Sequence, residues 1–115
     1  MATLVREGDT LWLKLSTAEK FEGVHGDLHA PVASVVAATT LDDAIHAVHG
    51  MKLPGSQLPG VFAMGTFLDS DGRTFAIVHH HPAGGVRVTF RGGSRYTQWI
   101  VSADDPAAVV ASLGF

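Results

Sequence analysis

The feature that most constrains this chain is a two-residue alternation of apolar and polar side chains, broken at short intervals by glycine-containing turns. The alternation is clearest over 86–91 (VRVTFR). Successive side chains of a β-strand point to opposite faces, so this pattern predicts strands with one face in the core and one in solvent. Aspartate and glycine at the breaks, as in 69–72 (DSDG) and 92–93 (GG), are typical of hairpin turns. The sequence therefore predicts a mainly β protein.

Between the breaks, local patterns predict an order of elements. A strand at 2–6 pairs with one at 10–15 as a hairpin, and a helical turn over 17–22 follows. Next come a strand over 31–39 and a short helix between Thr40 and Gly50. The chain ends with a meander of four strands, over 61–68, 74–78, 86–91 and 96–103, and a terminal helix. The terminal helix has the clearest end signals. Asp104 and Asp105 are suited to cap it, Pro106 to begin it, and Gly114 to end it.

Seven strands with one polar face each have to hide their apolar faces against one another. A closed barrel and two packed sheets both achieve this, and the terminal helix would then cover one open end. A chain of 115 residues without an internal repeat or linker is expected to form one domain over 1–115. We therefore expect a seven-stranded bent barrel or sandwich with short connecting helices and a C-terminal capping helix.

Composition excludes several classes of function. The chain has no cysteine, which rules out disulfides, zinc–thiolate sites and thiol nucleophiles. Its formal net charge is −3, and its eight lysines and arginines are scattered, so neither a nucleic acid nor an anionic membrane is an expected partner. No basic start with an apolar run resembles a signal peptide, and no apolar run approaches the roughly 20 residues that span a bilayer. These observations predict a cytoplasmic protein.

Three adjacent histidines in mid-chain are the first candidate for chemistry. On a strand, His79 and His81 share one face and His80 points to the other, so at most two of the three can bind one ion. Imidazole is a good ligand for copper, nickel and zinc. The alternative interpretation is the solvated end of a strand before Pro82.

A second histidine group lies in the predicted helix after Thr40. Offsets of three and four residues place Asp42, His46 and His49 on one helical face, as a metal or haem site would require. Asp42 is equally explained by the helix dipole, and the two histidines by exposure to solvent. Metal or haem binding through His79 and His81, or through His46 and His49, is thus one alternative function.

Catalytic patterns are missing. No serine lies in a Gly-x-Ser-x-Gly setting, and Asp69 and Asp71 belong to a hairpin turn that needs such residues. We therefore expect no enzymatic activity and no cofactor. The aromatic residues Trp12, Tyr96 and Trp99 are predicted to line the interior, and a pocket for a small ligand at the barrel mouth is the alternative.

Self-association is the function that the sequence favours. The loop 53–60 carries two Pro-Gly pairs, and Leu53, Leu58 and Val61 give it an apolar edge. An exposed strand edge offers a second surface of this kind. We therefore predict a non-enzymatic interaction module that binds a protein partner or a second copy of itself.

The order and spacing of several short motifs resemble the pleckstrin-homology-like family, in particular small bacterial single-domain proteins of that fold. The segments that carry the resemblance are 31–35 (PVASV), 54–55 (PG), 59–60 (PG), 65–66 (GT), 72–75 (GRTF) and 100–106 (IVSADDP). The resemblance implies a seven-stranded bent barrel capped by a C-terminal helix, and it implies no catalytic residues. Members that bind phosphoinositides carry several basic residues at the first hairpin loop. Here that loop, 7–9 (EGD), is acidic, so phosphoinositide membrane binding is not expected.

Overall fold

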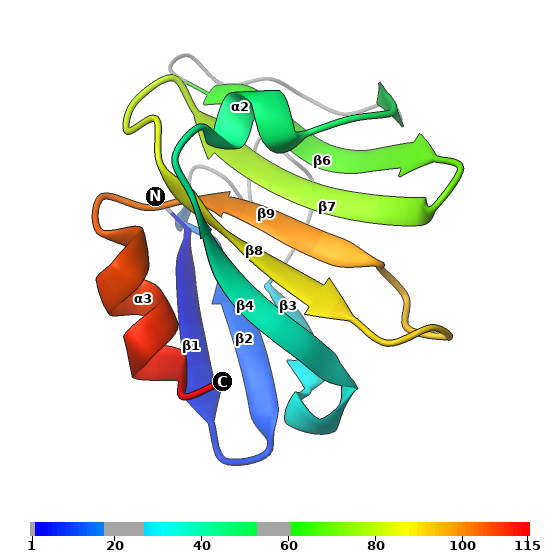
Figure 1. Ribbon diagram of the computed structural model, residues 1–115, viewed down its shortest axis with the longest axis vertical. Coiled ribbons are helices and arrows are strands. Elements are labelled where there is room, and N and C mark those ends of the chain that lie inside the picture. Colours follow the sequence, from blue (N-terminus) through cyan, green and yellow to red (C-terminus); the bar gives the residue numbers. More distant parts are fainter. Residues whose placement is uncertain (1, 18–26, 53–60) are drawn as a thin grey trace.

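Figure 1 shows the computed structural model, which describes residues 2–17, 27–52 and 61–115, without the side chains of residues 52, 61 and 62. In chain order the described elements are β1 (Thr3–Glu7), β2 (Thr10–Lys14), β3 (Leu28–Pro31), the 3-10 helix η1 (Val32–Ser34), β4 (Val35–Leu41), α2 (Ala44–Ala47), β5 (Met51–Lys52), β6 (Val61–Asp69), β7 (Gly72–His79), β8 (Gly85–Phe90), β9 (Gln98–Ser102) and α3 (Pro106–Leu113). The prediction of a mainly β protein is confirmed.

The strands form two sheets. The smaller sheet has the order β1-β2-β3 and the larger one β4-β8-β9-β7-β6-β5. The predicted hairpin at the N-terminus is confirmed as β1 and β2, which pair antiparallel from Thr3 with Lys14 to Glu7 with Thr10. Two packed sheets, rather than a closed barrel, therefore hide the apolar faces, and the described residues form nine strands instead of seven.

The predicted four-strand meander is wrong in one respect. Strand β9 lies between β7 and β8, pairs antiparallel with β8, and pairs parallel with β7. In β7 the side chains from 74 to 78 are all buried, and in β9 those from 99 to 102 are. Strands buried on both faces belong in the middle of a sheet, which explains why β9 is not at an edge.

Both faces of the larger sheet are covered. One face packs against the smaller sheet through a core that includes Leu11, Leu13, Phe75, Val88 and Trp99. The other face packs against α2 and its flanking residues through a separate cluster that includes Ala44, Ala76, Val78 and Ile100. Figure 1 shows the resulting layers, with α2 and the β1–β3 sheet on opposite sides of the larger sheet.

Helix α3 confirms the predicted C-terminal helix and its end signals. The Asp105 carboxylate accepts a hydrogen bond from the Ala108 N–H at 3.1 Å, Pro106 is the first helical residue, and Gly114 has a φ of 72°. The helix contacts β1, β4 and β8, and Arg6 of β1 donates to the Leu113 carbonyl at 2.9 Å. It thereby covers the side on which β1 and β4, each an outer strand of its sheet, come together (Figure 1).

The strand predicted over 31–39 begins later than expected. Strand β3 ends at Pro31, η1 follows, and β4 begins at Val35 in the other sheet. Backbone hydrogen bonds hold this crossing: the Val32 N–H donates to the Asp9 carbonyl and the Arg91 N–H to the Ser34 carbonyl, both at 2.8 Å. The β-branched run therefore forms β4 from Val35 onwards, and its first residues make the crossing between the sheets, which the local pattern did not indicate.

The helix predicted between Thr40 and Gly50 is shorter than expected. Strand β4 continues to Leu41, and α2 spans only Ala44–Ala47, with Asp43 in place of Thr40 as its N-cap. Residues 18–26, which include most of the predicted helical turn at 17–22, lie outside the described part of the chain, as do residues 53–60. Among the described helices, none is long and apolar enough to cross a membrane.

Candidate functional site

A pocket opens between β3 and the connection from β8 to β9. Its volume is about 280 Å³. The described residues that line it are Asp27, Leu28, His29, Ala30, Phe90, Ser94, Arg95, Tyr96 and Trp99. Strand β3 is the outer strand of the smaller sheet on the side away from β1, whereas α3 covers the β1 side. The pocket therefore lies at the end of the core that α3 leaves open.

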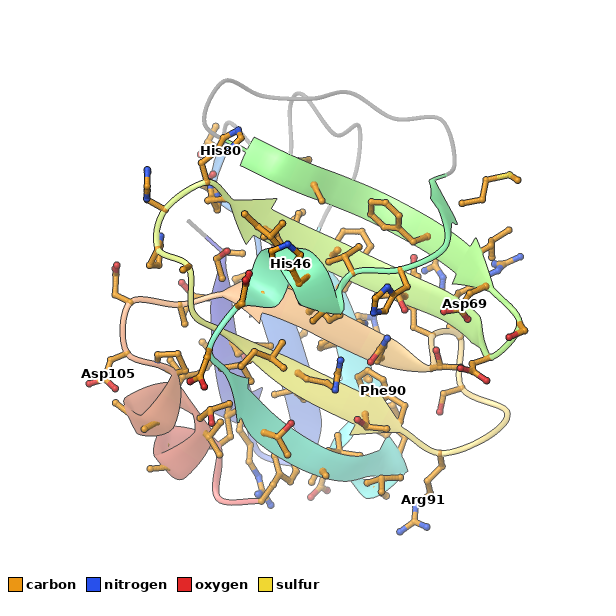
Figure 2. The ribbon with its side chains drawn as sticks, turned by 45° about the horizontal axis from the view of Figure 1, so that its top comes forward. His46, Asp69, His80, Phe90, Arg91 and Asp105 are labelled. Carbon is orange, nitrogen blue, oxygen red and sulfur yellow. The ribbon has the colours of Figure 1, made fainter. Side chains whose placement is uncertain are left out.

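Buried aromatic rings form its inner wall. Phe90 and Trp99 meet edge to face, with ring centroids 4.8 Å apart and planes at 68°. Tyr96 meets Phe75 in the same way at 5.7 Å and 71°. Such contacts fix the positions of the rings, and Figure 2 shows Phe90 near the end of β8. The wall is therefore rigid and apolar.

Polar groups surround the opening. The Arg95 guanidinium carbon lies 5.3 Å from the centroid of the Tyr96 ring, a cation–π arrangement. The Asp27 carboxylate accepts a hydrogen bond from the Leu15 N–H at 2.8 Å, which holds it at the start of β3. His29 is exposed, and its ring lies 4.9 Å from that of Trp12. Arginine, carboxylate and imidazole thus occupy one rim.

The indole of Trp99 carries a buried donor without a partner. The side chain is 1% exposed, and among the described groups no acceptor bonds its Nε1–H. Burying an unsatisfied donor costs about 1–3 kcal/mol, and native structures contain few such groups. Within the pocket lining, this is the one buried side-chain donor of the described residues that is left unsatisfied.

The sequence predicted part of this site. Tyr96 and Trp99 were candidates for a ligand pocket, and the structure brings both into one. Trp12 lies beyond the rim, where it contacts His29, its partner in the β2–β3 register. Asp27, Ser94 and Arg95 were not predicted from the sequence. A signal for the last two was present, because a serine and an arginine directly before Tyr96, after a Gly-Gly turn, place donors beside an aromatic ring.

The histidine run does not form part of a described metal centre. Strand β7 ends at His79, which is partly buried and whose N–H donates to the Ser102 hydroxyl at 2.9 Å. His80 and His81 are exposed. Across residues 2–17, 27–52 and 61–115, no group of three or more histidine, aspartate or glutamate side chains is placed to hold a metal ion. Figure 2 shows His80 at the end of β7 and His46 on α2, on separate elements.

The expected helical face of Asp42, His46 and His49 is absent, because α2 ends at Ala47 and so includes His46 alone. His46 instead interacts with Asp43, to which its Nδ1–H donates a hydrogen bond. This bond is the main reason that the pKa of the Asp43 carboxyl is lowered from its usual value. The pair fixes the start of α2.

The apolar loop predicted for self-association cannot be placed. Leu53 and Leu58 lie outside the described residues, and Val61 is the first residue of β6, with its side chain not described. Two exposed apolar side chains offer other places for association. Val36 in β4 is 59% exposed and Met51 in β5 is 74% exposed.

A second hollow, of about 270 Å³, lies between β1, β8, β9 and the start of α3. Its described lining is largely apolar and includes Leu4, Val86 and Val109. Of the two aspartates at its edge, Asp105 is occupied as the cap of α3. It therefore offers fewer groups for recognition than the pocket beside β3.

Comparisons with protein-family models, with curated proteins and with solved structures found no match to this chain. The case for a function therefore comes from the pocket's own residues.

Proposed function

We propose that this protein is a non-catalytic binding module and that the pocket between β3 and the β8–β9 connection holds a small ligand. The observation that carries the proposal is the described lining, in which the buried rings of Phe90 and Trp99 form an apolar wall and the polar side chains of Ser94 and Arg95 lie at the opening. Small-molecule sites typically combine an apolar wall with a few polar groups, and their volumes begin near 300 Å³.

Binding is favoured over catalysis by the arrangement of the rim. Catalysis at this rim would require a nucleophile and a base that activates it. Ser94 has the hydroxyl group that could act as the nucleophile, and His29 has the imidazole that could act as the base. Within the described structure these two side chains share no hydrogen bond, and His29 instead faces the ring of Trp12. The rim therefore supplies groups for recognition without an activated nucleophile.

A thermal-shift screen of ring-containing fragments tests the proposal. Ala30 lines the pocket, so Ala30→Phe is expected to fill it, whereas Ala107 is exposed on α3 and Ala107→Phe is the matched control. Fragments that raise Tm in the wild type and in Ala107→Phe are expected to lose this effect in Ala30→Phe. Near-ultraviolet circular dichroism checks that both variants keep the packed core. Equal stabilisation of Ala30→Phe, or no stabilising fragment for the wild type, contradicts the proposal.

A second candidate is self-association, which the sequence favoured through an exposed strand edge or the loop 53–60, and which we propose to occur at β4. Strand β4 is one of the two outer strands of the larger sheet, and among the described strands it pairs with β8 alone. Its register shifts between Val35 and Ala37, and this irregularity turns Val36 out to solvent. In this proposal a second copy of the chain pairs edge to edge, with the two Val36 side chains in contact.

Light scattering across a concentration series tests the second candidate. The wild type is expected to show a dimer at high concentration, and Val36→Lys is expected to shift it to the monomer. Thr39→Lys, an exposed position on the same strand, is the control for added charge. A wild type that stays monomeric at all concentrations contradicts this candidate and leaves the pocket proposal unaffected.

Membership of the pleckstrin-homology-like family is also a proposal, as is a cytoplasmic location. Two packed sheets and a C-terminal helix at one side support the family assignment. If the assignment is right, family members of known structure share the parallel pairing of β7 with β9. An experimental structure of this protein in which the neighbours of each strand are assigned tests the family assignment directly.

A further inference from the structure

We infer that the ligand of the pocket beside β3 is a small organic monoanion, a carboxylate joined to a compact ring or branched apolar group. This inference rests on the proposed binding function and adds the chemical class of the ligand. It follows from three features of the lining: the sign of its available charge, its excess of donors, and its size.

The available charge is that of Arg95. Its guanidinium is held over the Tyr96 ring, and among the described residues no acceptor hydrogen-bonds it. Arginine stays protonated at all physiological pH values and presents a planar fork of N–H donors that fits a carboxylate with two parallel bonds. Contact with the ring face leaves the donor edges of the guanidinium accessible to such a group.

Asp27 has the opposite charge to Arg95, and its position limits how far it neutralises the guanidinium. One carboxylate oxygen of Asp27 accepts the Leu15 N–H bond, and no ion pair joins Asp27 to Arg95 across the rim. Arg95 is therefore not neutralised by its nearest acidic neighbour in the lining. Among the described lining residues one arginine is opposed by one carboxylate, so this part of the rim suits one negative charge better than the two or more of a phosphate ester.

Ser94 adds a further donor at the rim. Its hydroxyl belongs to the same described lining as the Arg95 guanidinium. A carboxylate, or a carbonyl or ether oxygen beside it, supplies acceptors only, which matches this set. A cationic ligand would leave these donors unsatisfied and would meet Arg95 with like charge.

The apolar part of the lining sets the size of the ligand. Leu28, Ala30 and Phe90 lie with Trp99 around a volume of about 280 Å³. A volume near the lower limit for ligand pockets matches a single substituted ring. Aromatic edges and faces around the site also favour a flat ring, which can meet them edge to face.

Isothermal titration calorimetry with benzoate, benzamide and benzylamine tests the inference, since the three probes share one ring and differ in charge. Wild-type protein is expected to bind benzoate at least about tenfold more tightly than benzamide, as a charge-assisted hydrogen bond provides, and benzylamine most weakly. In Arg95→Gln the preference for benzoate over benzamide is expected to disappear. Arg91→Gln is the control, because Arg91 is exposed, donates to the Ala33 carbonyl and does not line the pocket.

Three results overturn the inference. Equal affinities for benzoate and benzamide in the wild type would remove the anion preference. A preference that survives in Arg95→Gln would remove Arg95 as its source. Binding of none of the three probes would remove the ligand class, and the fragment screen with Ala30→Phe then decides separately whether the pocket binds other small molecules.

Discussion

Replacing Trp99 by phenylalanine tests whether its indole donor is unsatisfied in the free protein. The change keeps an aromatic ring against Phe90 but removes two ring carbons, which at about 0.8 kcal/mol for each buried carbon group costs roughly 1.6 kcal/mol. It also removes the buried Nε1–H, whose unsatisfied burial costs about 1–3 kcal/mol. The two effects have opposite signs, so Trp99→Phe is expected to change the free energy of unfolding by less than about 1 kcal/mol. Trp99→Ala is expected to lose about 3–5 kcal/mol, because it empties the buried site altogether.

Urea denaturation followed by far-ultraviolet circular dichroism measures both values, with Trp12→Phe as the control for a tryptophan outside the core. A loss above about 3 kcal/mol in Trp99→Phe would refute the reasoning, because it would mean that an acceptor already bonds the indole N–H in the free protein. A Trp99→Ala variant as stable as the wild type would refute the placement of Trp99 in the core.

Two further predictions concern the larger sheet and α2. A methyl group added at Gly85 would lie 2.6 Å from the Val101 carbonyl oxygen, so Gly85→Ala is expected to lower the free energy of unfolding by about 1–3 kcal/mol. Gly92→Ala is the control and is expected to be better tolerated, because no atom lies within 4 Å of the added group. Equal losses of stability in urea denaturation would contradict the close approach of β8 and β9. NMR titration is expected to find the pKa of the Asp43 carboxyl below its usual value, and His46→Ala is expected to raise that pKa. Because the pKa is lower in the folded than in the unfolded state, the carboxylate stabilises the fold above the unfolded-state pKa, and this contribution is lost as the pH falls through the folded-state pKa. An unchanged Asp43 titration in His46→Ala would contradict the pairing.

Local signals in the sequence predicted local structure well. The turn at 69–72 follows from its aspartates and glycine, and in the structure Asp69 accepts bonds from the Asp71 and Gly72 N–H groups. The bounds of α3 follow in the same way from Asp105 and Gly114. Each of these features depends on side-chain and backbone groups within four residues of one another.

Pairing between distant strands was harder to predict. The position of β9 between β7 and β8 depends on the parallel register of Phe75 with Trp99, which no turn specifies. A signal was present, because 99–101 (WIV) is apolar without alternation, as strands buried on both faces are. The order of the strands along the chain predicts a meander, but the burial of both faces of β9 places it between β7 and β8.

The candidate site was predicted only on one side for the same reason. Tyr96 and Trp99 stand out as aromatic residues of one segment, in and before β9. Asp27, directly before β3, and His29, within β3, line the same pocket but belong to the other sheet. Their place depends on the crossing at η1 and on the pairing of Trp12 with His29. Alternation within a single strand contains no information about either.

The central claim, that the pocket beside β3 takes a small anionic ligand, is tested most directly by NMR observation of the two indole N–H groups during a benzoate titration. Trp99 lines the pocket and Trp12 lies outside it, so each spectrum contains the probe and its control. We predict a saturable shift of the Trp99 indole signal, with the larger backbone shifts at Leu28, Ser94 and Arg95, and little change at Trp12. A Trp99 signal that does not move while the protein binds benzoate, or that moves no more than that of Trp12, would contradict the claim.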